Sequence, residues 1–200
     1  MRDLVVLVPD KAAEYVVRGA LGRKESLGIR EIDFKVIVDP GRDGGVRRRG
    51  VQLLRVERHQ FTHAVLMFDY EGSGAANPAA DLENQLDAAL SEEWGSGAKA
   101  IVIEPEVDIW MWGAETHIRD VVDWHSQAGI RDWLTARDFQ FSVHGKPERP
   151  KEALEAVFRH AQLPRSSAHY EALARRLSLA RCQDPAFLRL RTALATWFEP

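Results

Sequence analysis

Four short apolar runs, separated by segments with helical spacing, constrain the fold of this chain more than any other feature. The runs cover residues 4–8, 34–38, 64–68 and 100–103. Apart from Lys35, each run is continuous rather than alternating, which is typical of strands buried on both faces of a parallel sheet. Helices are predicted between them, over 11–21, from the glycine-rich turn at 41–45 to about residue 59, and over 78–94. We therefore predict an α/β fold of the Rossmann-like kind, with roughly four mostly parallel strands and helices on both faces.

The remainder of the chain, from about residue 147 to residue 200, has a helical pattern only. One helix is marked by Leu154, Val157 and Phe158, a second by Tyr170, Leu173 and Leu177, and a third begins at Asp184-Pro185. This tail is too short to bury a core of its own, so we expect it to cover the α/β core. The prediction is one domain over 1–200, with its core at about 1–115 and a C-terminal helical extension at about 147–200.

Composition excludes several functional classes. A net charge of −3 argues against a polycation that coats nucleic acid, although local basic patches remain open. The single cysteine, Cys182, excludes an intrachain disulfide framework and a cysteine-rich zinc site, and favours the reducing cytoplasm. The apolar run at 4–8 is too short for a signal-peptide core or a membrane span, so we expect a cytoplasmic protein without membrane association.

Acidic residues follow three of the four predicted strands. They are Asp10 and Glu14 after the first, Asp69 and Glu71 after the third, and Glu104, Glu106 and Asp108 after the fourth. The carboxyl ends of parallel strands meet at one edge of a sheet, where ligands bind. Each acid taken alone could be a helix cap or a turn residue. Together, without cysteine or a histidine set beside them, they favour a site for Mg²⁺ or Mn²⁺.

The same layout resembles the Toprim domains of topoisomerases, primases and nucleases of the overcoming-lysogenisation-defect type. An acid ends the first strand, a glycine turn follows the second, and an acid-x-acid motif, Asp69-Tyr70-Glu71, ends the third. The chain is also similar to a family of small Toprim-like bacterial proteins. The matching stretches are Asp10-Lys11-Ala12-Ala13-Glu14, Asp108-Ile109-Trp110, Lys146-Pro147 and Asp184-Pro185-Ala186-Phe187, which together span most of the chain.

This resemblance implies roles for individual residues. Asp69, Glu71 and Asp108 would hold Mg²⁺ or Mn²⁺, and Asp10, supported by Glu14, would perform general acid–base catalysis. The implied activity is a Mg²⁺-dependent nuclease, or a nuclease-like component of a bacterial antiphage defence system. The chain departs from the family pattern where aspartate replaces glutamate at Asp10 and Asp108, and where Lys11 replaces a glycine. These departures favour an alternative, a non-catalytic scaffold or binding subunit of a defence complex with a degenerate site.

Arginines crowd the predicted helix that follows the glycine turn. Arg47, Arg48 and Arg55 are candidates for contacts with nucleic-acid phosphates. A solvated helix face would have the same composition, so both interpretations stay open. The resemblance implies nucleic acid and other proteins of a defence operon as possible partners. A third alternative is an enzyme that handles a small phosphate-containing molecule on a doubly wound fold.

Overall fold

A four-stranded parallel sheet forms the centre of the protein, as the apolar runs predict. The computed structural model describes residues 1–164, 166–176, 179 and 182–200. The strands are β1 (Arg2–Val8), β2 (Phe34–Val38), β3 (Phe61–Asp69) and β4 (Ala98–Ile103). Their spatial order is β2-β1-β3-β4, and every neighbouring pair is parallel. The predicted α/β class is thus confirmed, and the order places the ends of β1 and β3 side by side.

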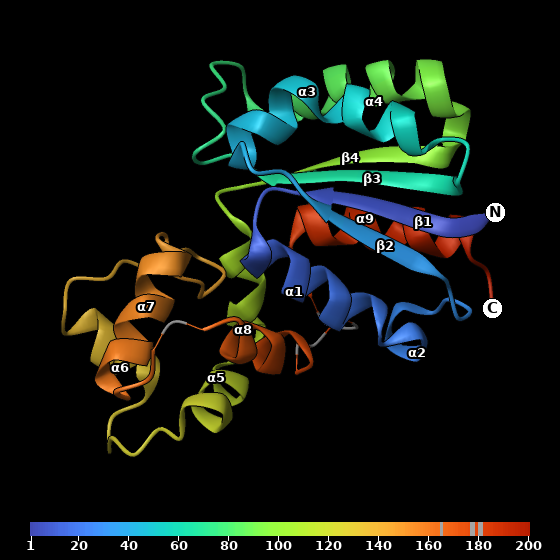
Figure 1. Ribbon diagram of the computed structural model, residues 1–200. Coiled ribbons are helices and arrows are strands. Elements are labelled where there is room, and N and C mark those ends of the chain that lie inside the picture. The colour runs from blue at the N-terminus through green and yellow to red at the C-terminus, as the bar shows by residue number, and fades with distance from the viewer. Residues whose placement is uncertain (165, 177–178, 180–181) are drawn as a thin grey trace.

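Helices cover both faces of the sheet (Figure 1). The helices α3 (Arg42–Glu57) and α4 (Ala79–Trp94) pack on one face, and α1 (Lys11–Leu21) and α9 (Pro185–Trp197) pack on the other. At Gly50, an added Cβ would lie 2.6 Å from Cδ1 of Leu66. A glycine at this position therefore lets α3 lie directly on β3.

The remaining elements are short. They are α2 (Lys24–Leu27), the 3₁₀ segments η1 (Gly95–Gly97) and η2 (Val107–Gly113), and the helices α5 (Glu115–Val122), α6 (Ile130–Thr135), α7 (Pro150–His160) and α8 (Ser167–Ala174). The helix α8 packs on α1, where Gly19 faces Ala174, and α7 packs on η2. Buried residues of α7, α8 and α9 belong to the same hydrophobic core as β1. The predicted tail helices are therefore present, except that Leu177 lies outside the described residues.

Side chains close the open edge of β4. The carboxylates of Glu83 and Asp87, one turn apart on α4, accept from the backbone N–H of Val102 and of Ala100, both at 2.7 Å. Arg189 of α9 donates to Glu83 and to the carbonyl of Val102. These contacts occupy backbone groups that would otherwise be available to another strand. Among the described helices, none is both long and apolar enough to cross a membrane.

Candidate metal and phosphodiester site

A cleft of about 600 Å³ opens at the carboxyl ends of the strands. Its walls come from the end of β1, the first turn of α3, the loop that follows β3 and the start of α7. Five carboxyl groups that line it have no basic partner within 3.9 Å among the described residues, namely Asp10, Asp43, Asp69, Glu71 and Glu106. We call this cavity the acidic cleft. It lies where ligands bind in open parallel sheets.

Backbone N–H groups orient four of these carboxylates, including Glu106, which accepts from the N–H of Lys151 at 2.9 Å. Asp10 caps α1 and accepts from the N–H of Ala13 at 2.9 Å. Asp43 accepts from the N–H of Asp69 at 2.9 Å, and Asp69 in turn accepts from the N–H of Val107 at 2.8 Å. Each bond uses one oxygen of its carboxylate. The bonds tie β3, α3 and η2 together around a shared negative centre.

The electrostatics of the acidic cleft disfavour full ionisation. Burial, with the nearby charge of Asp43, raises the pKa of Asp69 well above its ordinary value. Burial also raises the pKa of Asp43, and the charge of Asp10 adds to the effect. The pKa of Glu106 rises to about 7 through burial and through repulsion by Asp108 and Glu71. Burial is the main cause of all three shifts and repulsion between carboxylates adds to it, and a cation bound beside these groups would oppose both.

Two of the predicted acidic site residues lie outside the acidic cleft. Glu14 is buried on α1 and forms ion pairs with Lys11 at 2.6 Å and with Arg18 at 2.9 Å. Asp108 is also buried and accepts a hydrogen bond of 2.7 Å from the hydroxyl of Tyr170 on α8. Both carboxylates are thus held by neighbours. Asp10, Asp69 and Glu71 are the predicted acids that line the cleft.

The three predicted arginines of α3 have different surroundings. Arg48 is exposed and lines the acidic cleft. Arg47 is half-buried, with its guanidinium close to Gly74 in the loop after β3. Arg55 pairs with Glu93 of α4 at 3.2 Å and does not line the cleft. The structure therefore places Arg48 alone of the three at the cavity wall.

Six further charged residues of the acidic cleft were not among the predicted site residues, and two of them, Arg149 and Glu152, form an ion pair. Asp43 belongs to the glycine-rich turn, and it contacts Asp69 because α3, which begins in that turn, packs on β3. Glu106 was visible as an acid after β4, but its orientation depends on the N–H of Lys151. Arg42 and Lys151 add positive charge to the wall. The sequence signal for Asp43 was an acid between glycines at the start of a helix.

The donor chemistry of the acidic cleft suits a hard divalent cation, because its carboxylates offer oxygen ligands and excess negative charge. Among the residues that the structure describes, no three histidine, cysteine or acidic side chains are close enough together to hold a metal ion. The ligand types therefore fit a metal, and binding would require the carboxylates to draw together.

Comparison with known proteins supports the fold. No protein-family model matches the sequence, and no curated protein matches it either. The C-terminal region of the Burkholderia pseudomallei OLD protein superimposes with a TM-score of 0.54 and 12% sequence identity, over 98% of each chain. The chain therefore has a Toprim-like Rossmann-type fold, and the predicted resemblance to overcoming-lysogenisation-defect proteins is confirmed at the level of fold.

Proposed function

We propose that the chain is a divalent-metal-dependent nuclease of the Toprim type that acts on nucleic-acid phosphodiesters. One observation carries the proposal. Carboxylates from the N-cap of α1, the first turn of α3 and the end of β3 share one cavity with the cationic side chains of Arg42, Arg48 and Lys151. Cleavage of a phosphodiester uses both kinds of side chain. A metal held by carboxylates binds the phosphoryl oxygens, and fixed cations balance the charge of the phosphate.

The residues of the acidic cleft divide into three groups by their contacts. Asp43, Asp69, Glu71 and Glu106 would hold Mg²⁺ or Mn²⁺, which when bound stabilises negative charge on the phosphoryl group and orients an attacking oxygen. Asp10 uses one carboxylate oxygen as the cap of α1. Its other oxygen would accept a proton from water at the rim of the cleft.

The cationic group acts on the substrate. Arg48 is exposed, and no described residue forms an ion pair with it. It would contact the nucleic-acid backbone where the strand leaves the cleft. Lys151, whose ammonium lies 4.0 Å from Glu106, would place its charge beside the phosphoryl oxygens.

The test uses the full chain with labelled single-stranded and double-stranded DNA and RNA, in Mg²⁺, in Mn²⁺ and in EDTA. We expect metal-dependent cleavage by the wild type and a loss of at least about a hundredfold in an Asp43→Asn/Asp69→Asn variant. Asp120→Asn is the matched control, because Asp120 is an exposed acid on α5 that does not line the cleft. Equal cleavage by the double variant, or no cleavage of any substrate, contradicts the proposal.

A second candidate function is a non-catalytic binding subunit with the same fold. It is favoured by the ion pairs that hold Glu14 and by the separation of the acidic groups. Calorimetry with Mg²⁺ and Mn²⁺ separates the two, since the nuclease requires metal binding that Asp69→Asn weakens. The proposed antiphage role, with nucleic acid or defence proteins as partners, predicts that the chain reduces phage plaques and that the double variant does not.

A further inference from the structure

Arg42 has a backbone conformation that arginine rarely adopts. Its φ is 54°, in the left-handed region, at the first residue of α3. Glycine occupies this region without steric cost, whereas a side chain adds strain. Residues strained in this way cluster at functional sites. The neighbour Gly41 shows that the turn itself accepts glycine.

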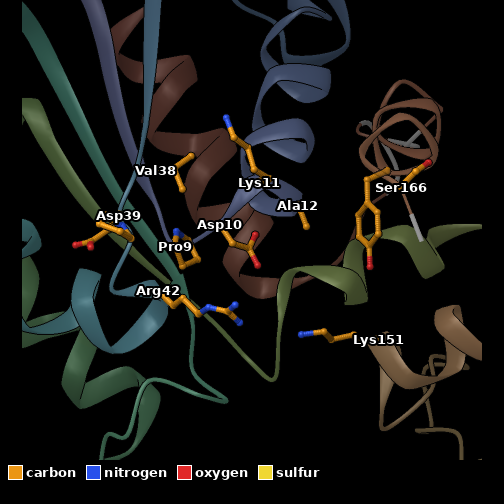
Figure 2. Close-up of a pocket in the computed structure, with 11 residues that line it drawn as sticks. Pro9, Asp10, Lys11, Ala12, Val38, Asp39, Arg42, Lys151 and Ser166 are labelled. Carbon is orange, nitrogen blue, oxygen red and sulfur yellow. The ribbon is translucent and has the colours of Figure 1, made fainter. Parts of the chain in front are cut away.

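The side chain of Arg42 has no structural partner that would explain the strain. It is exposed, and none of the acidic groups in the described part of the chain forms an ion pair with it. Figure 2 shows its guanidinium extended toward the same space as the carboxylate of Asp10 and the ammonium of Lys151. These three groups line both the acidic cleft and a second cavity beside it.

The second cavity, which we call the side pocket, has a volume of about 480 Å³. It shares the charged side chains named above with the acidic cleft. Pro9 and Val38 provide apolar surface and Ser166 provides a hydroxyl group, whereas the hydroxyl of Tyr170 donates to Asp108. Two cations, apolar surface and a polar group suit a nucleotide, with its phosphate beside the shared cations and its sugar and base against the apolar surface.

We propose that the side pocket binds the nucleotide unit adjacent to the phosphodiester in the acidic cleft, and that Arg42 holds the phosphate between the two cavities. This inference rests on the proposed nuclease function and adds to it a binding site for the nucleotide on one side of the phosphodiester that is cut. The same chemistry fits the end of a nucleic-acid strand or a free nucleotide. The experiment therefore includes both ligands.

Binding is measured in EDTA, so that cleavage does not intervene. The probe is a fluorescein-labelled oligothymidylate of about eight nucleotides, followed by anisotropy at several salt concentrations. We expect Arg42→Gly to bind about tenfold more weakly, with a salt slope smaller by about one. The thermal unfolding midpoint of this variant stays unchanged or rises, because glycine relieves the strain. Arg58→Ala, at the far end of α3, is the charge-matched control and binds like the wild type.

A second variant tests the pocket itself. Ala12 is half-buried on α1 and lines the side pocket, so Ala12→Trp should fill it. Thymidine 5′-monophosphate competes with the probe in the wild type, and we expect Ala12→Trp to lose this competition while its circular dichroism stays unchanged. Wild-type probe affinity in Arg42→Gly, or unchanged competition in Ala12→Trp, overturns the inference.

The two proposals fail in different ways. Binding of the mononucleotide in direct calorimetry, without binding of the oligonucleotide probe, would assign the pocket to a free nucleotide and refute its role beside a cut strand. Because these measurements exclude metal, such a failure leaves the metal-dependent cleavage test unaffected. Equal cleavage by the wild type and by Asp43→Asn/Asp69→Asn would refute the proposed nuclease function. The binding results would still stand in that case.

Discussion

Replacing Glu106 by glutamine should stabilise the protein, and the stabilisation should depend on pH. Glu106 is 8% exposed and accepts a hydrogen bond of 2.9 Å from the N–H of Lys151. Glutamine keeps that acceptor oxygen and removes the charge. The ion pair that is lost is weak, since the ammonium of Lys151 lies 4.0 Å from the carboxylate.

The magnitude follows from the raised pKa of Glu106. Its pKa rises from 4.5 to about 7, mainly through burial. Between these values the folded protein holds a proton that the unfolded chain has released, so the free energy of unfolding falls as pH rises. The full shift corresponds to about 3.4 kcal/mol above pH 7. Because the cleft is open to water, we expect about 2 kcal/mol, or roughly 4–8 °C in Tm.

Urea unfolding of the wild type and of Glu106→Gln, in EDTA, checks this value. At about pH 4 the two should have equal stability, because the carboxyl is protonated in both states. At about pH 8 the variant should be more stable by about 2 kcal/mol. Saturating Mg²⁺ should stabilise the wild type more than Glu106→Gln at the higher pH. A destabilised variant at high pH, or the same difference at both pH values, would refute the reasoning.

Three further predictions concern the frame that carries the acidic cleft. Glu83→Ala should lower the free energy of unfolding, measured in urea, by about 3 kcal/mol. The substitution removes the carboxylate that accepts from Arg189 and from the buried N–H of Val102. A change under about 1 kcal/mol would contradict this. Gly50→Val should cost about 1–3 kcal/mol in the same assay, since its Cβ would meet Leu66, whereas an unchanged midpoint would show that α3 can move. Arg49 of α3 donates to the carboxylate of Asp39 and holds the pKa of that carboxyl below its ordinary value. Stability should therefore fall as pH drops through the range below about 4, and acid titration of Asp39→Asn should show a smaller fall.

The alternation of strands and helices was predictable from the sequence because burial determines which residues are apolar. A strand covered on both faces must be apolar throughout, as residues 4–8 and 64–68 are. Helix boundaries followed from equally local signals, such as the Asp10 cap of α1 and the Asp184-Pro185 start of α9. The positions of Asp10, Asp69 and Glu71 at strand ends were predictable for the same reason.

The composition of the site was decided by tertiary structure. Pairwise distances among the acids depend on how the strands and helices pack, and the packing of α3 on β3 brings Asp43 to Asp69. The partners of an acid depend on packing, which gives Glu14 two cations and buries Asp108 beneath Tyr170. By itself, then, the sequence determined a parallel sheet with an acidic edge, because the apolar strands and the acids that follow them are local sequence patterns. Only the folded chain decided which carboxylates remain without a counter-charge, because charge balance is a property of neighbours in space.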